Sequence, residues 1–189
     1  MFPYSRTLAG SILSIALLLV TLPAVSQTGS RAKPAKQEEK TDSTLAHAVH
    51  HQLQEVPFYS VFDYLSFSID GSRVTLTGQV QRLTLKAQAE AAVKSLEGVS
   101  TVVNKIEVEP PSASDHEVGR NIYRSIFEDH ILQKYAVEAV PPIHIIVKNG
   151  TVNLEGIVDS EADKMLAGNL ASKVPGVSNL RNNLAVHKK

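Results

Sequence analysis

Three histidines lie close together near the start of the chain, and two of them have the spacing of a metal-binding pair. His47 and His51 are four residues apart, which would place both rings on one face of a helix, and His50 lies between them. The sequence suggests no third ligand nearby, so a solvated polar face also explains all three. His116-Glu117 lacks the second histidine of a zinc-protease helix. The prediction is therefore that the protein has no metal site and no cofactor.

Common catalytic motifs are absent from the sequence. The chain has no cysteine, and we find no Gly-x-Ser-x-Gly nucleophile turn, phosphate loop or dinucleotide fingerprint. Asp159, Ser160 and Asp163 have the arrangement of a helix start and not of a catalytic pair. A non-enzymatic protein is predicted.

Aromatic and basic residues gather in one segment of the second half of the chain. Residues four apart there would form an apolar stripe beside a core stripe: Tyr123, Phe127, Ile131 and Tyr135. Arg120 and Arg124 flank this stripe one turn apart, and Lys134 follows. An apolar arc edged with basic residues is typical of a lipid-headgroup boundary or a protein-binding surface. The predicted site is Arg120, Tyr123, Arg124, Phe127 and Lys134; the alternative is that the stripe packs against the other half of the chain.

The elements that would position these residues follow from an internal repeat. A constant offset of 78 residues places Val74 on Val152 and Leu76 on Leu154. The same offset places Gly78 on Gly156, Gly98 on Gly176 and Asn104 on Asn182. Because only two copies are present, and each is longer than a typical solenoid repeat, the pattern indicates a duplicated module.

Hydrophobic periodicity gives the elements of each module. Alternation at 65–69 and 143–147 predicts a strand, and Asp70-Gly71 and Asn149-Gly150 are typical hairpin turns. A second strand, a helix over 89–96 or 167–174, and a third strand follow. A further helix precedes each hairpin, with apolar residues stepping by about four; there the offset falls to 73, so the second copy has five extra residues.

The predicted fold class is α+β, with two tandem αββαβ modules. Each is expected to contain a small three-stranded mixed sheet with two helices on one face, over residues 41–109 and 115–187. Gly78 and Gly156 fall where a large inward side chain is expected, which indicates a close approach of backbone. Gly98 and Gly176 are expected to terminate helices, and Asn104 and Asn182 to satisfy buried backbone groups. We interpret these six as structural residues.

Both copies resemble the BON domain. The resemblance rests on Val74-x-Leu-x-Gly-x-Val80, Gly98-Val-x-x-Val102 and Asn104-x-Ile-x-Val108, with their counterparts 78 residues later. It implies a periplasmic or envelope location, a role in envelope integrity or osmotic stress, and binding to phospholipid surfaces. BON modules also occur in channels and secretion pores. Many envelope members are lipoproteins, and this chain lacks the cysteine that would carry a lipid.

The start of the chain has the features of a cleaved export signal. In residues 1–26, Arg6 is the only charge, an apolar run of about 13 residues follows, and Ala24-Val25-Ser26 offers small residues for cleavage. An uncleaved anchor is the alternative. Residues 27–40 are expected to form a flexible linker. The sequence thus predicts a soluble protein of the periplasm or cell envelope that is not a lipoprotein.

Overall charge excludes one class of partner. The 19 basic and 19 acidic residues cancel, so no broad positive field would attract nucleic acid. We expect binding of anionic phospholipid at the membrane surface, or, as the alternative, a role as a protein-interaction and assembly adaptor without lipid contact. No small-molecule substrate is expected.

Overall fold

The computed structural model describes residues 35–187, with side chains from residue 43 onwards. The predicted signal peptide and residues 27–34 of the predicted linker lie outside the described residues. Residues 35–40, also assigned to the linker from sequence, form the first turns of helix α1 (Ala35–Gln54).

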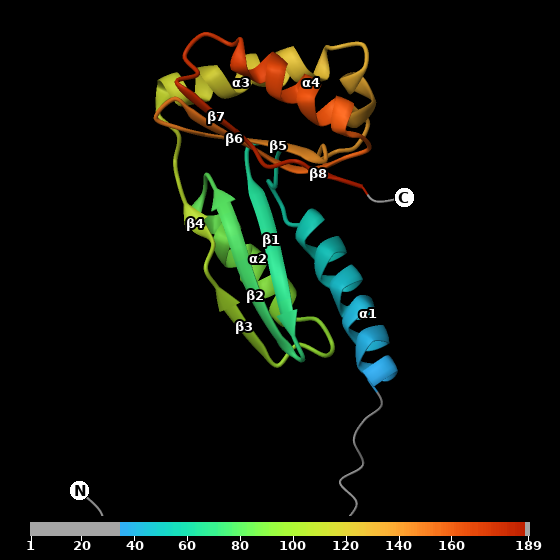
Figure 1. The fold of residues 1–189 in the computed structure, drawn as a ribbon. Helices are drawn as coiled ribbons and strands as arrows, with labels where there is room; N and C mark the ends of the chain where they lie inside the picture. The colour runs from blue at the N-terminus through green and yellow to red at the C-terminus, as the bar shows by residue number, and fades with distance from the viewer. Residues whose placement is uncertain (1–34, 188–189) are drawn as a thin grey trace, which may run out of the picture. The chain divides into compact units, whose positions relative to one another are not determined.

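The first module follows the predicted order of elements (Figure 1). After helix α1 come strands β1 (Tyr64–Asp70) and β2 (Arg73–Val80), helix α2 (Leu83–Lys94), and strands β3 (Thr101–Asn104) and β4 (Glu107–Val108). On α1, the apolar residues that step by four are buried: Leu45, Val49 and Leu53. This confirms the face of the helix that was expected to enter the core.

The second module repeats this order with one addition. Its elements are α3 (Ala113–Phe127), the short 3-10 helix η1 (Leu132–Ala136), β5 (Ile143–Lys148), β6 (Thr151–Val158), α4 (Glu161–Ser172), β7 (Asn179–Asn182) and β8 (Ala185–Val186). Helices α3 and α4 lie together on one face of the sheet that β5, β6 and β7 form (Figure 1). Helix η1 occupies part of the segment in which the second copy carries its extra residues.

Strand pairing is the same in both modules. Strand β1 pairs antiparallel with β2, and β2 pairs parallel with β3 and then β4. Strands β5, β6, β7 and β8 repeat these pairings. Each sheet is therefore mixed, as expected, and the chain has the predicted α+β fold with two αββαβ modules. In strand pairing, the one difference from the predicted sheet is that the third strand of each module is divided into two pieces.

Asn104 and Asn182 lie at the point where the third strand divides. The Asn104 amide nitrogen donates to the Lys86 backbone oxygen of helix α2 at 3.0 Å, and its side-chain oxygen accepts from the Ile106 amide at 3.1 Å. Asn182 makes the same two contacts, with Lys164 of α4 at 2.7 Å and Leu184 at 3.4 Å. The side chain thus takes up an amide that leaves the strand ladder and ties the strand to the helix.

The backbone passes very close to Gly78 and Gly156. Both have positive φ angles, +123° and +115°. A Cβ atom at these positions would overlap the backbone carbonyl oxygen of Tyr64 in the first module and of Pro142 in the second. Both positions therefore require glycine for conformation and for space.

Gly98 and Gly176 also have positive φ angles, +89° and +93°, but they do not terminate helices as expected. Helix α2 ends at Lys94 and α4 at Ser172, and their C-caps, Ser95 and Lys173, are right-handed. The glycines turn the chain a few residues later, on the way to the third strand.

Each module has its own hydrophobic core. The core of the first module is built around Val49, Leu76 and Ile106, and that of the second around Ile122, Leu154 and Leu184. Val61, which precedes β1, belongs to the core cluster of the second module, and Phe62 packs against the same cluster. Two residues that the sequence places in the first copy therefore complete the core of the second. Among residues 35–187, the helices lack the combination of length and apolar character needed to cross a bilayer.

Candidate functional site

Helix α3 is held at its N-terminus by a buried carboxylate. The Ser112 hydroxyl caps the helix by accepting from the Asp115 amide at 3.1 Å. The Asp115 carboxylate accepts from the Gly150 amide at 2.9 Å and the Asn149 amide at 3.1 Å, both in the β5–β6 turn. Burial alone would raise the pKa of Asp115, but these amides and the Ser112 hydroxyl hold it below its ordinary value. The start of α3 is thereby fixed to the hairpin.

One face of α3 packs on the sheet. Val118, Ile122 and Ile126 are buried in the second core, as their spacing predicted. Gly119 lies on the same helix beside the ring of Phe62, and a Cβ atom there would lie 3.5 Å from that ring. This packing fixes the rotation of α3 and determines which residues face solvent.

Three of the five predicted site residues lie on the outer face of α3. Arg120, Tyr123 and Arg124 are exposed, with Tyr123 37% exposed. Within residues 43–187, neither arginine side chain forms an ion pair. The Tyr123 ring lies 6.3 Å from that of Phe62, so it borders the first module's segment while keeping an exposed edge. The structure therefore contains both features that the sequence left open, an exposed surface and a contact between the two copies.

The predicted apolar stripe does not continue beyond α3. The helix ends at Phe127, whose side chain is only 6% exposed, with its ring 4.8 Å from that of Tyr123. Ile131 is 45% exposed in the following turn, and Tyr135 is buried in η1. The Asp129 side chain accepts from the Ile131 amide at 2.9 Å and starts this turn. Residues four apart were therefore wrongly assigned to one helical face, because the helix stops before the second pair.

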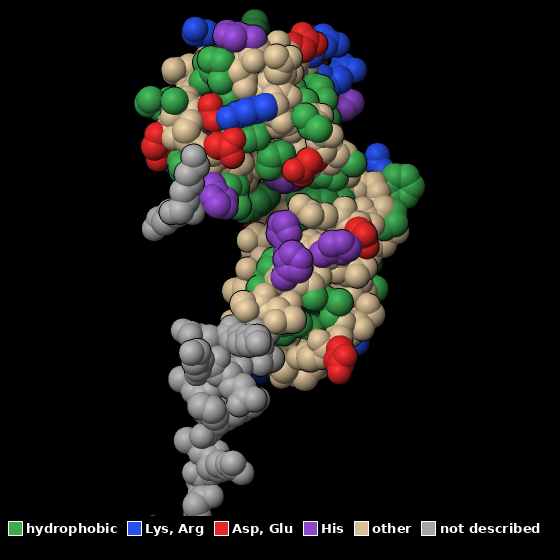
Figure 2. Space-filling view, turned by 90° about the vertical axis from the view of Figure 1, so that its right-hand side faces the viewer, with side chains coloured by type: hydrophobic (Ala, Val, Ile, Leu, Met, Phe, Trp, Pro, Cys, Tyr) green, Lys and Arg blue, Asp and Glu red, His purple; other side chains and the backbone are tan. Residues whose placement is uncertain are grey.

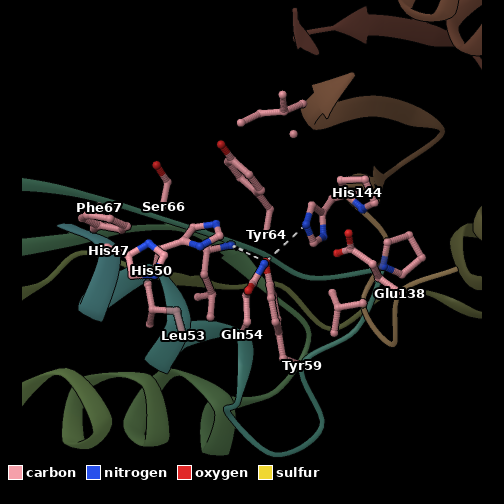
Figure 3. Close-up of a pocket in the computed structure, with 16 residues that line it drawn as sticks. His47, His50, Leu53, Gln54, Tyr59, Tyr64, Ser66, Phe67, Glu138 and His144 are labelled. Carbon is pink, nitrogen blue, oxygen red and sulfur yellow. Dashed lines mark hydrogen bonds between the residues drawn. The ribbon is translucent and has the colours of Figure 1, made fainter. Parts of the chain in front are cut away.

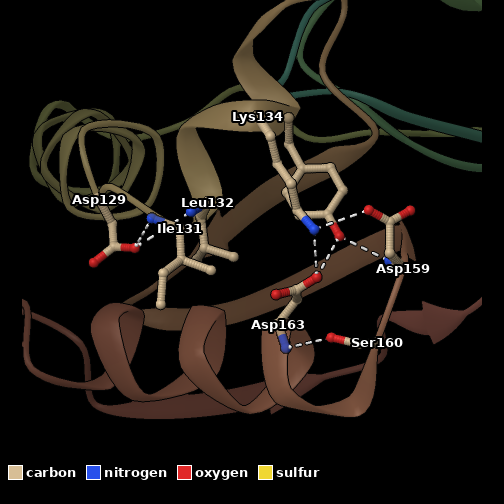
Figure 4. A network of polar contacts seen from close by, with 8 residues as sticks. Asp129, Ile131, Leu132, Lys134, Asp159, Ser160 and Asp163 are labelled. Carbon is tan, nitrogen blue, oxygen red and sulfur yellow. Dashed lines mark hydrogen bonds and ion pairs between the residues drawn. The ribbon is translucent and has the colours of Figure 1, made fainter.

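Lys134 lies away from the arginines and within a polar network (Figure 4). Its ammonium contacts the carboxylates of Asp159 and Asp163, each at 2.9 Å. The Tyr135 hydroxyl donates to Asp163 at 2.8 Å and accepts from the Asp159 amide at 2.7 Å. The network joins η1 to the start of α4, which Ser160 caps.

In this network one ammonium is shared by two carboxylates. Hydrogen bonds that Lys134 donates to Asp159 and Asp163 raise the pKa of Lys134, so it stays protonated. Burial opposes ionisation of Asp163, but Lys134 and Tyr135 keep its pKa below the ordinary value. Because two carboxylates already bind the ammonium, Lys134 does not extend the positive surface of α3.

A contact between Tyr59 and His144, which the sequence did not predict, joins the two modules. On the face shown in Figure 2, histidine side chains gather near the middle. Three histidines line one pocket in the structure, namely His47, His50 and His144 (Figure 3). His144 of β5 is buried, and its ring stacks on that of Tyr59 with centroids 5.5 Å apart. The repeat gives no hint of this contact, because the offset of 78 places His144 on Ser66.

The two histidines with metal-like spacing, His47 and His51, lie on helix α1. Between residues 43 and 187, no group of three or more His, Asp or Glu side chains is placed to hold a metal ion. The His51 ring lies 3.7 Å from Glu55 on the same helix, and His47 lines the pocket of Figure 3. The two histidines of the metal-like spacing therefore face different surroundings.

Comparison with known proteins gives one family and a few relatives. The family model for the BON domain matches residues 41–110 and 125–188. Osmotically-inducible protein Y of Escherichia coli is 33% identical over 132 residues, which cover 64% of this chain and 60% of that protein. This chain thus spans less than two thirds of that relative's length.

Solved structures with detectable likeness come from the type III secretion protein CdsD of Chlamydia trachomatis. Two such structures are each 12% identical, with TM-scores of 0.27 and 0.28. Both cover 76% of this chain, and 98% and 92% of their own chains. The two family matches fall on the two modules and together cover more than half of the sequence. The chain belongs to the BON domain family.

Proposed function

We propose that the protein is a non-enzymatic, exported envelope protein that binds anionic phospholipid surfaces through the outer face of α3. The observation that carries this proposal is the group Arg120, Tyr123 and Arg124, exposed on one helix whose opposite face is anchored in the core. Membership of the BON family, and a relative named for induction by osmotic stress, support a role in envelope integrity or osmotic-stress tolerance.

The chemistry of this surface suits a headgroup layer. Guanidinium groups bind phosphate oxygens in a bidentate manner, and a partly exposed tyrosine is favoured where an apolar region meets water. Each basic residue near an anionic bilayer contributes about 1 kcal/mol. Two arginines therefore give weak binding that depends on salt, which is appropriate for a reversible surface contact. Phe127 and Lys134 are not part of this proposed surface, since one is buried and the other is paired with carboxylates.

Co-sedimentation with vesicles tests the proposal. The full chain should bind vesicles containing phosphatidylglycerol and should not bind pure phosphatidylcholine, with affinity falling as salt rises. The double variant Arg120→Glu, Arg124→Glu should bind at least 30-fold more weakly, because about 2 kcal/mol of attraction is lost and replaced by repulsion.

A matched control carries the same change of net charge elsewhere. Arg73 in β2 and Arg181 in β7 are exposed and lie outside α3, so Arg73→Glu, Arg181→Glu should bind within about threefold of the natural chain. Glu117 lies one turn before Arg120 on the same exposed side, and Glu117→Gln should strengthen binding by a few-fold. Equal binding of the two double variants would remove α3 as the site.

A role as a protein adaptor is the competing outcome. If the natural chain binds no vesicle at any salt concentration, lipid binding is refuted. Cross-linking in intact cells that captures a protein partner through Tyr123 would then assign the same surface to assembly.

A further inference from the structure

A pocket of about 610 Å³ lies beside strand β1 and is lined from both modules (Figure 3). Helix α1 and strand β1 supply one wall, and residues 138–144 with the end of β6 supply the other. This volume is within the range of small-ligand sites, which occur preferentially where domains meet. The pocket is separate from the α3 surface, because none of Arg120, Tyr123 and Arg124 lines it.

The half-buried hydroxyl of Tyr59 in this pocket has unfulfilled hydrogen-bonding capacity. The Tyr59 hydroxyl accepts from the Leu65 amide at 3.4 Å and lies 3.4 Å from Nε2 of His144. Both distances exceed the usual range for such bonds. The other ring nitrogen of His144, Nδ1, is buried from solvent, and the backbone carbonyls of Asp63 and Ser60 lie near the ring. The two long contacts leave the Tyr59 hydroxyl, beside the His144 ring, able to form a further hydrogen bond with a polar group of a ligand.

The pair is also uncharged at neutral pH. Burial lowers the pKa of His144 to about 4, although the nearby backbone carbonyls of Asp63 and Ser60 favour the protonated ring. Burial likewise raises the pKa of Tyr59. The Tyr59 hydroxyl can donate to Nε2 of His144 or accept from it, depending on the tautomer of the ring. A ligand would therefore meet neutral donors and acceptors.

The remaining lining is mainly aromatic and aliphatic. The Tyr64 ring lies 5.5 Å from that of His144, and Phe67 and Ile157 add apolar surface. Apart from the histidines, Glu138 is the one titratable acid or base in the lining that is charged in its ordinary form, and no lysine or arginine contributes. An anionic group would find no lysine or arginine here, whereas an uncharged apolar body would be surrounded by rings.

We propose that this pocket binds an uncharged small molecule with an apolar body, which places a hydroxyl or carbonyl group against Tyr59 and His144. Because the walls come from both modules, an occupant would also strengthen the contact between them. Ligand binding and the relative stability of the two modules would then be coupled.

Titration with the uncharged dye N-phenyl-1-naphthylamine tests the proposal. The full chain should give a saturable rise in dye fluorescence at pH 7.5. We expect 1-octanol to displace the dye, and octanoate, which is anionic at this pH, to displace it at least tenfold more weakly. No saturable binding, or equal displacement by the alcohol and the anion, would overturn the proposal.

Two tryptophan variants on one strand locate the site. Ser66 of β1 lines the pocket, and Ser68 lies on the same face of the strand but outside the lining. Ser66→Trp should fill the pocket and weaken dye binding at least tenfold, while Ser68→Trp should stay within twofold. Equal binding by both variants would place the dye elsewhere and refute the assignment.

A second pair of variants tests the same site in case Ser66→Trp does not fold. Ile157 lines the pocket and is 51% exposed, and Ile131 is 45% exposed outside the lining. Ile157→Glu should weaken dye binding at least threefold relative to Ile131→Glu, and no difference would count against the pocket. Arg120→Glu, Arg124→Glu should bind dye normally, so failure of vesicle binding and failure of this proposal are distinguishable.

Discussion

The edge strands of the two sheets differ although the strands beside them match. In β5, Ile143, His144, Ile145 and Ile146 are all buried, whereas the corresponding residues of β1, from Leu65 to Ser68, are half-buried or exposed. The difference arises because the Ile145 amide donates to the Val61 backbone oxygen at 2.8 Å, so a segment of the first module covers β5. One copy of the module thus donates a covering segment and the other receives it.

Residues that are identical in the two copies of the repeat have the same geometry, and residues that differ between the copies account for the different contacts of the two modules. Gly78 and Gly156, and Asn104 and Asn182, have the same geometry in both modules. The first module has no histidine at the position of His144 and no counterpart of the Tyr135 network; His144 contacts Tyr59 of the first module, and Tyr135 joins η1 to α4. The duplicated residues build the scaffold, and the residues where the copies diverge determine what each module contacts.

Substitution of the paired glycines should have the largest effect and tests the equivalence of the modules directly. Gly78→Ala and Gly156→Ala should each lower the free energy of unfolding by about 3 kcal/mol or more, because a Cβ atom meets a backbone carbonyl at a positive φ angle. Urea denaturation of the full chain measures this loss. Gly71→Ala is the control, since its φ is positive and no atom lies within 4 Å; it should cost about 1 kcal/mol. A small effect at only one of the paired glycines would break the comparison.

Acid should destabilise the protein through His144, which only the second module carries. The folded state holds the pKa of this ring at about 4, and an unfolded chain protonates histidine near 6.5. Between these values the unfolded state binds more protons, so stability is full above pH 6.5 and falls toward pH 4. We expect a loss on the order of 3 kcal/mol over this window.

Urea denaturation of His144→Gln at several pH values isolates this contribution. The variant should lose most of the pH dependence between pH 6.5 and 4, while His50→Gln, which alters an exposed residue, should retain it. The same slope in His144→Gln and the natural chain would assign the acid sensitivity to other groups.

Substitution of the two equivalent asparagines should have an intermediate effect in both modules. Asn104→Ala and Asn182→Ala each leave a helix carbonyl and a strand amide without their partner, at a cost of about 2 kcal/mol. Asn104 also donates to the Glu90 carboxylate at 3.0 Å, where the second module has Gly168. Asn104→Asp should therefore be the more harmful of the two aspartate variants, because two carboxylates would meet. The opposite order in thermal denaturation would contradict this geometry.

Removal of the Tyr135 hydroxyl should have the smallest effect and should act on the second module alone. Tyr135→Phe deletes the bond to Asp163 and the bond from the Asp159 amide, which should cost about 1 kcal/mol. Tyr123→Phe is the control, as its ring is partly exposed. Hydrogen exchange should show faster opening at the start of α4 in Tyr135→Phe only; unchanged protection there would show that the network does not hold η1 to the helix.

Most of the scaffold followed from the sequence, because a duplicated pattern is a strong constraint. Alternation and helical spacing in two copies gave the elements, and the constant offset identified the glycines and asparagines. The division of the third strand was not predicted, since it depends on a side-chain oxygen taking an amide from the ladder. Local periodicity carries no information on such a contact.

The candidate site was only partly predictable. Spacing of four placed Ile131 and Tyr135 on one helix with Tyr123, but Asp129 interrupts that helix by accepting amides of the following turn. Aspartate at a turn is a recognisable sequence feature and was the available indication. Lys134 was assigned to the lipid surface because its partners Asp159 and Asp163 are distant in sequence. The contact between Tyr59 and His144 was not predicted for the same reason, since tertiary contacts bring together residues that no short motif connects.

Because Val61 and Phe62 pack in the second core, folding of the two modules is linked. During synthesis the first module leaves the ribosome before β5 has been made. Val61 and Phe62 therefore remain exposed to solvent until the second module folds. A fragment ended at residue 110 would keep them exposed permanently, and a fragment begun at residue 111 would lack part of its own interior. Each half of the duplicated chain is thus finished only when the other has folded.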